Sequence, residues 1–130
     1  MNIRHYLFIC LAIISTASSY SQQEKNKYNS FRPGQIWEDN TGTHINAHGG
    51  GILFHEEKYY WFGEHKGEKT NAALVGVTCY SSSDLYNWTN EGVALPVSDD
   101  AKSLITRGST IERQKVIYNA KTGKFVMYFH

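Results

Sequence analysis

The feature that most restricts the fold of this sequence is a weak internal repeat of two hairpin-like segments. The first, HGGGILFHEEKYYWFGE, runs from His48 to Glu64, and the second, ERQKVIYNAKTGKFVMYFH, runs from Glu112 to His130. When the two are aligned, with two extra residues in the second turn, their apolar and aromatic runs coincide. Any two hairpins align to some degree, but a four-stranded unit that restarts after roughly 64 residues is typical of a β-propeller blade.

The rest of the chain favours strands throughout. Short apolar runs alternate with turn residues, and a 3.6-residue period is almost entirely absent. AALVGVTCYSS follows the first hairpin, and after the turn SSDLYNW comes EGVALPV, where Pro96 is tolerated at a sheet edge. The sequence therefore predicts an all-β chain that holds about the first one and a half blades of a β-propeller. Because a propeller needs at least about four blades to close, we expect a piece of a longer protein rather than a smaller complete fold.

The N-terminal residues predict export. Residues 1–21 carry one arginine, an apolar stretch and then small polar residues, which is the pattern of a secretory signal peptide. No segment approaches the ~20 apolar residues of a membrane-spanning helix. Residues 22–33 are a polar lead, ordered structure is expected near FRPGQIW, and residues 34–130 are the N-terminal part of the propeller domain. We expect a secreted or periplasmic monomer without a membrane span.

Composition narrows the partners. A net charge of +1, from 13 basic and 12 acidic residues, argues against a nucleic-acid or membrane-surface partner. Nine tyrosines and three tryptophans suit either a β-sheet core or a surface that stacks on sugar rings, and composition does not choose between them. Only Cys79 remains after the signal peptide, so no internal disulfide is expected. We expect Cys79 to be a small buried apolar residue.

Histidines and glycines are concentrated around the first hairpin. His44 and His48 lie ~13 Å apart along a strand, too far to share one zinc ion at ~2.1 Å, so no metal site is predicted. His55 and His65 stand at strand ends and are expected to face solvent. Glycines 49–51 are not followed by the Lys-Ser/Thr and helix of a phosphate loop. They predict a close approach of another strand or of a ligand, so that packing and a pocket floor both remain open.

Two carboxylates are the candidates for chemistry. Glu64 ends an aromatic strand, and Glu112 opens the second repeat at the position equivalent to His48. Glycosidic cleavage needs two carboxyl groups, which inverting enzymes hold roughly 6.5–9.5 Å apart. The alternative is that both are ordinary solvated charges, with Glu64 paired to Lys66 and Glu112 paired to Arg113 or Lys115.

Four blocks together resemble glycoside hydrolase family 43, and its exo-β-1,3-galactanase branch most of all. They are WEDNTGTHINAHGGGIL, KYYWFGE, GVTCYSSSDLYNWTNEGVALPV and IERQKVIYNAKTGKFVMYFH, and the resemblance extends from about residue 34 to residue 130. It implies a five-bladed propeller with an axial funnel and an inverting mechanism. One local departure is Gln114, which stands where the family usually has proline and restores a backbone donor.

The resemblance also implies roles for single residues. Glu112 matches the carboxylate of blade two that tunes the pKa of the general acid. Glu64 matches a glutamate that contacts the sugar in the terminal subsite. The galactanase branch lacks the usual aspartate base of blade one, and this sequence has Asn46 and His48 where that aspartate would be sought. These two residues are therefore candidates for substrate binding.

The implied activity is exo-hydrolysis of β-1,3-galactan or a related galactose-containing polysaccharide. The general acid and the group that positions water are expected beyond His130, so the 130 residues alone are expected to be inactive. Two other hypotheses stay open: a non-catalytic carbohydrate-binding propeller and a non-functional gene fragment. No cofactor is expected, and no residue of this sequence argues for a calcium ion on the axis. The sequence does not fix the sugar or the linkage.

Overall fold

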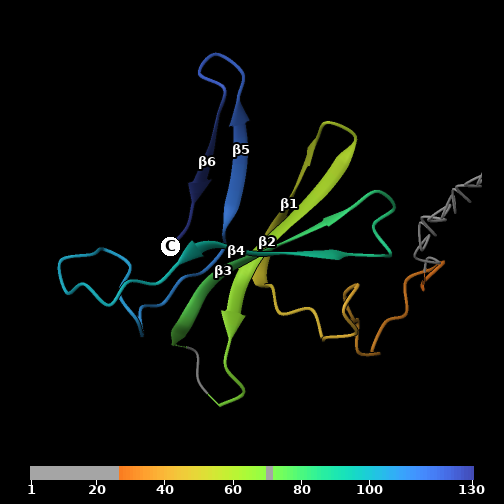
Figure 1. Ribbon diagram of the computed structural model, residues 1–130, viewed down its shortest axis with the longest axis horizontal. Helices are drawn as coiled ribbons and strands as arrows, with labels where there is room; N and C mark the ends of the chain where they lie inside the picture. Colours follow the sequence, from red (N-terminus) through yellow and green to blue (C-terminus); the bar gives the residue numbers. More distant parts are fainter. Residues whose placement is uncertain (1–26, 70–71) are drawn as a thin grey trace, which may run out of the picture.

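The computed structural model describes residues 27–69 and 72–130, and within them the chain forms two antiparallel sheets and no helix (Figure 1). One sheet has four strands in the order β1-β2-β3-β4, and the other is the hairpin β5-β6. The strands are β1 (His48–His55), β2 (Lys58–Lys66), β3 (Ala73–Ser82), β4 (Thr89–Pro96), β5 (Lys115–Asn119) and β6 (Lys124–Tyr128). The predicted signal peptide lies outside the described residues. The described part of the chain has no helix long and apolar enough to cross a membrane.

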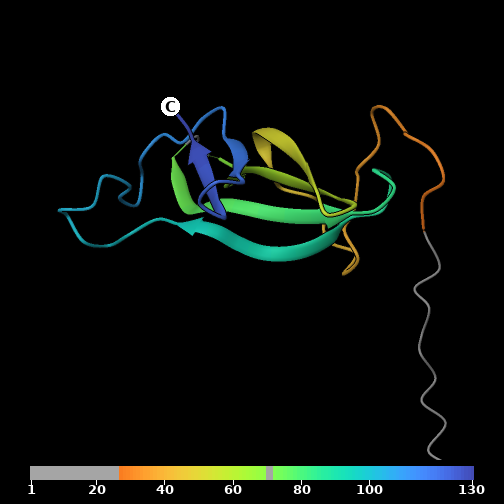
Figure 2. The same cartoon turned by 90° about the horizontal axis from the view of Figure 1, so that it is seen from above.

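The four-stranded sheet is a simple up-and-down meander. Each strand pairs with the next in the chain, and the sheet is strongly twisted (Figure 2). β4 forms one edge, where Pro96 ends the strand as expected. The second hairpin stands beside the first strand, because β5 contacts β1 (Figure 1). A four-stranded meander followed by a new hairpin is the arrangement that the repeat predicts.

The first hairpin contains a β-bulge at its open end. His48 pairs with Glu64 and Gly51 pairs with Phe62, so the two residues between His48 and Gly51 face the single residue Gly63. Gly49, the first residue of the bulge, has a left-handed φ of 60°. This is the backbone conformation of a bulge that begins with a left-handed residue, and it bends the strand locally.

The second hairpin repeats this bulge at the equivalent position. Glu112 and His130 exchange two backbone hydrogen bonds of 2.8 Å each, and the regular pairing then resumes at Lys115 opposite Tyr128. Arg113, the residue equivalent to Gly49, has a φ of 58°. The repeat seen in the sequence is therefore a repeat of the backbone, including its irregularity.

Two of the glycines are required by close packing. A Cβ on Gly50 would lie 1.9 Å from the carbonyl oxygen of Phe62. A Cβ on Gly51 would lie 2.9 Å from the carbonyl oxygen of Gln114, in the neighbouring hairpin. The expected close approach is thus confirmed, and it brings the two hairpins together.

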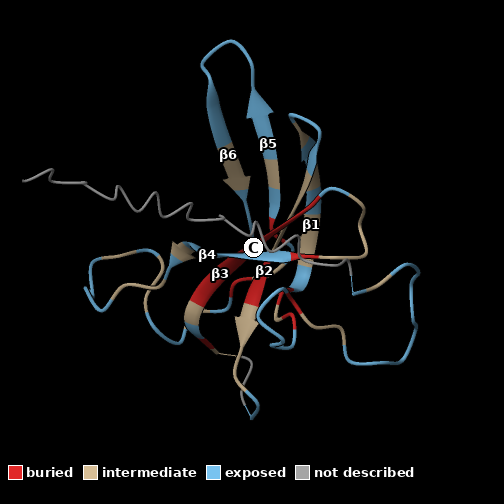
Figure 3. Cartoon of the chain, turned by 45° about the vertical axis from the view of Figure 1, so that its right-hand side comes forward, coloured by how far each residue is buried: buried red, intermediate tan, exposed pale blue. Residues whose placement is uncertain are grey.

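The core consists of two clusters of buried residues, and the buried part of the sheet lies in its central strands β2 and β3 (Figure 3). Successive residues of a strand alternate between faces, so Trp61 belongs to the first cluster and Phe62 to the second. The buried members of the first cluster are Ile45, Ala47, Tyr80 and Trp88. Those of the second are Ala73, Val77 and Ile111, and Met127 of β6 packs against them. The second cluster therefore attaches the β5–β6 hairpin to the sheet.

Two expectations about single side chains have different outcomes. Cys79 is buried, as predicted, and burial followed by the charge of Glu91 raises the pKa of its thiol to about 12. The expectation that His55 faces solvent is wrong. Its side chain is 20% exposed, and its ring centroid lies 4.4 Å from that of Tyr118 and 5.0 Å from that of Phe125. His55 is covered because the second hairpin packs beside β1.

Candidate glycosidase site

A hollow of about 200 Å³ lies where the two bulges meet. Its lining residues are His48, Gly49, Glu64, Lys66, Glu112 and Arg113. The two bulges lie close together, since a Cβ on Gly49 would be 3.7 Å from the backbone nitrogen of Arg113. Three of the four predicted site residues, His48, Glu64 and Glu112, therefore share one hollow.

Glu64 is the most unusual group in this hollow. The residue is only 1% exposed, although it carries a carboxylate at the end of a strand. It lies opposite the fully buried Val77 of β3, which explains its burial. One oxygen, Oε2, is 3.6 Å from the ammonium nitrogen of Lys66. The other, Oε1, is buried and has no hydrogen-bond partner among the described residues.

This geometry bears on both interpretations of Glu64, and its role in binding stays a prediction. The ion pair with Lys66 that the structural alternative predicts is present. A solvated strand-end charge, however, would not be buried with one oxygen unpaired. Leaving a buried polar atom unsatisfied costs roughly 1–3 kcal/mol, and more for a charged group. A hydroxyl group that donates to Oε1 would remove this cost, so Glu64 has the properties of a ligand-binding group.

Glu112 approaches the hollow from the second hairpin. It is half-buried, and its backbone is held by the paired hydrogen bonds to His130. Among the described residues no ion pair joins Glu112 to Arg113 or Lys115. The Lys115 ammonium instead donates to the carbonyl oxygen of Gly50 at 3.3 Å. The carboxylate of Glu112 is therefore part of the hollow lining and not of a surface ion pair.

Asn46 does not line the hollow. Its side chain is bound to the backbone of Lys66, with Nδ2 donating to the carbonyl oxygen at 2.8 Å and Oδ1 accepting from the amide at 2.9 Å. Its own amide donates to the Tyr80 hydroxyl at 3.2 Å, and its carbonyl accepts from the Thr78 hydroxyl at 2.6 Å. All four polar groups of Asn46 thus have protein partners.

Comparison with known proteins shows the family of this chain. No protein-family model and no curated protein matches it. Among solved structures, a GH43 β-1,3-galactosidase with galactodeoxynojirimycin is 60% identical over 75% of this chain, with a TM-score of 0.73. The exo-β-1,3-galactanase from Phanerochaete chrysosporium, solved with galactose, is 41% identical over 78% of it, with a TM-score of 0.72. An exo-β-1,3-galactanase from Clostridium thermocellum is 44% identical over 75% of it, with a TM-score of 0.64.

The chain belongs to glycoside hydrolase family 43. It spans 28%, 23% and 20% of the length of these three relatives, in the same order. The predicted resemblance and the predicted all-β partial propeller are both confirmed. The described residues of this family 43 chain correspond to one blade and the first hairpin of the next.

Sequence reasoning named Lys66 and Arg113 only as ion-pair partners and missed them as lining residues. Lys66 stands two residues after Glu64, and residues two apart on a strand share a face. Arg113 aligns with Gly49 in the repeat, so its place beside the hollow was also accessible from the alignment. Within the described residues, no group of three or more His, Cys, Asp or Glu side chains could hold a metal ion.

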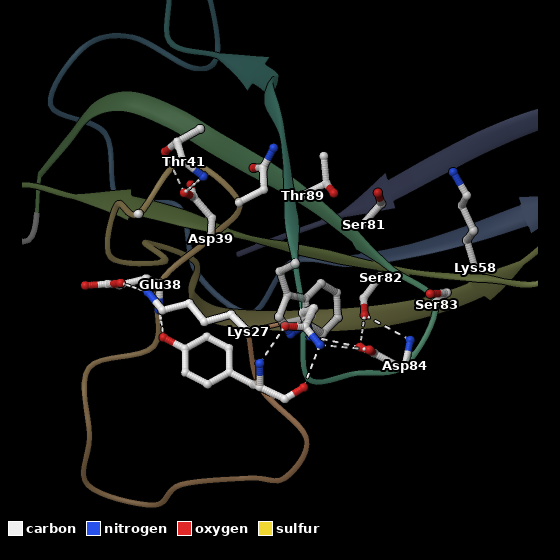
Figure 4. A pocket seen from close by; sticks show the side chains of 15 residues that line it. Lys27, Glu38, Asp39, Thr41, Lys58, Ser81, Ser82, Ser83, Asp84 and Thr89 are labelled. Carbon is white, nitrogen blue, oxygen red and sulfur yellow. Dashed lines mark hydrogen bonds and ion pairs between the residues drawn. The ribbon is translucent and has the colours of Figure 1, made fainter. Parts of the chain in front are cut away.

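A second, larger hollow of about 540 Å³ lies away from these residues, beside the turn between β3 and β4 (Figure 4). The carboxylate of Asp39 in this hollow accepts hydrogen bonds from the backbone amide and the hydroxyl of Thr41, at 2.8 and 2.6 Å. It also accepts one from the side-chain Nδ2 of Asn90 at 3.1 Å. Burial would raise the pKa of Asp39, but these hydrogen bonds outweigh it and hold the pKa below its ordinary value. Asp39 is therefore satisfied by its own loop.

Asp84 in the same hollow is satisfied in the same way. Its Oδ1 accepts from the amides of Tyr86 and Asn87 at 2.8 Å each, and its Oδ2 accepts from the Asn87 side chain at 2.9 Å. Asn87 also binds the backbone of Tyr28 through two hydrogen bonds. The chain is therefore attached to the sheet before the segment FRPGQIW, which starts at Phe31. The residues that line the larger hollow form a hydrogen-bond network that connects the β3–β4 turn to the N-terminal segment. Among the residues that the structure describes, none of those lining this hollow has a buried side-chain nitrogen or oxygen without a hydrogen-bond partner.

Proposed function

We propose that this chain forms part of the active site of a glycosidase that releases galactosyl residues from β-1,3-galactan or a related galactose-containing polysaccharide. The support from the comparisons is that the similar solved proteins are a β-1,3-galactosidase and exo-β-1,3-galactanases. The observation on this chain that carries the proposal is the buried, unpaired Oε1 of Glu64 in a hollow that it shares with Glu112.

Each of these side chains has a task in the proposal. Glu64 accepts a hydrogen bond from a hydroxyl group of the terminal sugar through Oε1. Glu112 lies across the hollow, holds the same sugar and tunes the proton affinity of the general acid. His48 pairs with Glu64 across the two strands and lines the same hollow. The reaction is a single displacement by water with inversion at the anomeric carbon.

The proposal places the remaining groups in the part of the enzyme that these 130 residues do not include. Inverting hydrolysis needs a proton donor for the leaving oxygen and a group that activates water on the opposite face of the sugar. We expect the chain alone to bind sugar without turning it over. On the evidence of its N-terminal sequence, we also propose that the protein is exported, and that it needs no cofactor.

The test is the substitution Glu112→Gln in the complete polypeptide that contains this segment, assayed for galactose release from β-1,3-galactobiose. We expect kcat to fall about 100-fold or more, because tuned acid–base catalysis contributes 10²–10⁴-fold. Glu64→Gln should mainly raise KM, by about tenfold, because it weakens a charged hydrogen bond. Glu57→Gln, at the exposed tip of the β1–β2 turn, is the matched control and should leave both constants unchanged.

Two results would contradict parts of the proposal. If Glu112→Gln retains activity within a few-fold of the unsubstituted enzyme, Glu112 does not belong to the catalytic set. If the complete polypeptide binds galactose but releases none from the disaccharide, the protein is a carbohydrate-binding propeller instead of an enzyme.

A further inference from the structure

We propose that Lys66 and Glu64 together bind two neighbouring hydroxyl groups of the terminal sugar, and that Asn46 is the positioning residue that holds Lys66 in place for this. The inference rests on the proposed function, since it concerns the same hollow. It assigns to Asn46 an indirect role, through Lys66, in place of direct contact with the sugar.

The first step is the attachment of Asn46 to Lys66. The Asn46 side chain forms two hydrogen bonds with the backbone of Lys66, at 2.8 and 2.9 Å. It thus binds the N–H and C=O of Lys66 as the backbone of a neighbouring strand would. Asn46 itself is fixed by the Tyr80 and Thr78 hydroxyls, which come from the buried strand β3. Lys66 is therefore connected to the centre of the sheet through Asn46.

The second step is that β2 needs such an attachment at this residue. The pairing of β2 with β3 is regular up to His65 opposite Gly76, and the next pair, Lys66 with Ala73, is out of register. The regular ladder alone does not determine where the backbone of Lys66 lies. The two-point contact with Asn46 holds the backbone of Lys66 at the residue whose side chain lines the hollow.

The third step is the arrangement of charges at the hollow. The Lys66 side chain is 25% exposed and that of Glu64 is 2% exposed, so the lysine is the more accessible member of the pair. Their 3.6 Å separation is that of an ion pair and not of a direct hydrogen bond. Both residues line the hollow: an ammonium is a hydrogen-bond donor, and Oε1 of Glu64 is an acceptor without a partner among the described residues.

This pair matches the chemistry of adjacent sugar hydroxyls. A hydroxyl group is both a donor and an acceptor. One hydroxyl can donate to Oε1 of Glu64 while its neighbour accepts from the ammonium of Lys66. A lysine that only balances the charge of Glu64 would make no such contact, and this difference can be measured.

The experiment is a thermodynamic cycle between lysine and hydroxyl groups. The complete polypeptide that contains this segment is titrated by calorimetry with galactose and with the 2-, 3-, 4- and 6-deoxy galactoses. For unsubstituted protein we expect two of these analogues to bind about tenfold or more weakly than galactose, one for each contacted hydroxyl. We call the loss of affinity on removal of one hydroxyl group the penalty of that hydroxyl. In Lys66→Met galactose itself should bind about tenfold more weakly, and one of the two penalties should disappear.

Further variants separate positioning from contact. Asn46→Ala should abolish the same hydroxyl penalty as Lys66→Met, and Lys66→Arg should retain part of it. Because Asn46→Ala also removes hydrogen bonds that support the sheet, Asn46→Asp is the second variant. It keeps the acceptor for the Lys66 amide, but it replaces the donor to the Lys66 carbonyl oxygen by a charged acceptor. A melting curve for each variant checks the fold, and Glu57→Gln serves as the unaffected control.

The outcomes are distinguishable from those of the proposed function. If unsubstituted protein binds no galactose, the proposed function fails and the inference fails with it. If it binds galactose but Lys66→Met keeps every hydroxyl penalty, only the inference is overturned. If Lys66→Met loses a penalty that folded Asn46→Ala and Asn46→Asp both keep, the positioning role of Asn46 is overturned.

Discussion

At the scale of single residues, Gly49 and Gly50 are neighbours that the fold requires for different reasons. Gly49 has a left-handed φ of 60°, but a Cβ there would meet only ordinary contacts, the nearest at 3.7 Å. Gly50 has no left-handed φ, but a Cβ there would lie 1.9 Å from the carbonyl oxygen of Phe62. The first glycine supplies a conformation and the second supplies space.

The two substitutions to alanine should therefore differ in cost. Gly49→Ala should lower the free energy of unfolding by about 1–2 kcal/mol, the cost of a left-handed residue with a side chain. Gly50→Ala should lower it by more than about 3 kcal/mol, because overpacking against backbone cannot be relieved by a side-chain movement. Urea denaturation of the two variants measures the difference. Equal costs would contradict the distinction between conformation and space.

The lowered pKa of Asp39 predicts that the folded protein becomes less stable at acidic pH. The pKa of its carboxyl is lower in the folded protein than its ordinary value, so its contribution to stability is fully present above the ordinary pKa. That contribution is lost as the pH falls below about 4 and through the folded pKa. We expect the melting temperature to fall between about pH 5 and pH 3, and Asp39→Asn to make this fall shallower.

A control shows whether the effect is specific to this loop. Asp99, whose side chain is 81% exposed, is the site for a matched Asp99→Asn substitution. If Asp99→Asn changes the acid profile as much as Asp39→Asn does, the hydrogen bonds of Asp39 are not the cause.

Sequence could bring Glu64 and Glu112 to the same region, because the repeat aligns Glu112 with His48, the strand partner of Glu64. It could not predict the part of Asn46, because its partner Lys66 is 20 residues away in the chain. Gln114 shows the same limit. It is fully buried, with Nε2 bound to the carbonyl oxygen of Ile111 at 2.9 Å and Oε1 without a partner among the described residues. Its place in the chain indicated only a restored backbone donor.

At the scale of the elements, hydrophobic alternation and turn residues were sufficient to predict the strands, because strand pairing between chain neighbours is local. The bulge in the second hairpin was not predictable, since it places Arg113, and not a glycine, in the left-handed region. The position of His55 was also not predictable from its own strand. It depends on the packing of β5 beside β1, a contact between residues distant in the chain.

The contact of His55 with the second hairpin gives a prediction about that hairpin. His55→Ala should weaken the docking of β5–β6 by about 0.5–1.5 kcal/mol, the typical value of an aromatic pair. Hydrogen exchange should become faster in β5 and β6 and stay unchanged in β2 and β3. Lys121→Ala, at the exposed tip of the same hairpin, should leave both unchanged. Uniformly faster exchange in all strands would show that His55 supports the whole fold instead.

At the scale of the whole molecule, the site lies between two units of one repeating architecture. β1 and β2 supply His48, Glu64 and Lys66, and the second hairpin supplies Glu112. The second hairpin is mostly exposed (Figure 3), and Phe125 and Tyr128 are 54% and 60% exposed. The partial propeller was predictable because the length of the repeating unit can be measured directly in the sequence. The roles of the site residues stay predictions.

The most direct test of the account is a crystal structure of this protein with bound galactose. The account predicts a single galactose in the smaller hollow, with a hydroxyl oxygen about 3 Å from Oε1 of Glu64 and with Glu112 in contact with the same sugar. Galactose bound in the larger hollow beside Asp39 and Asp84, or a smaller hollow without galactose at a saturating concentration, would contradict it.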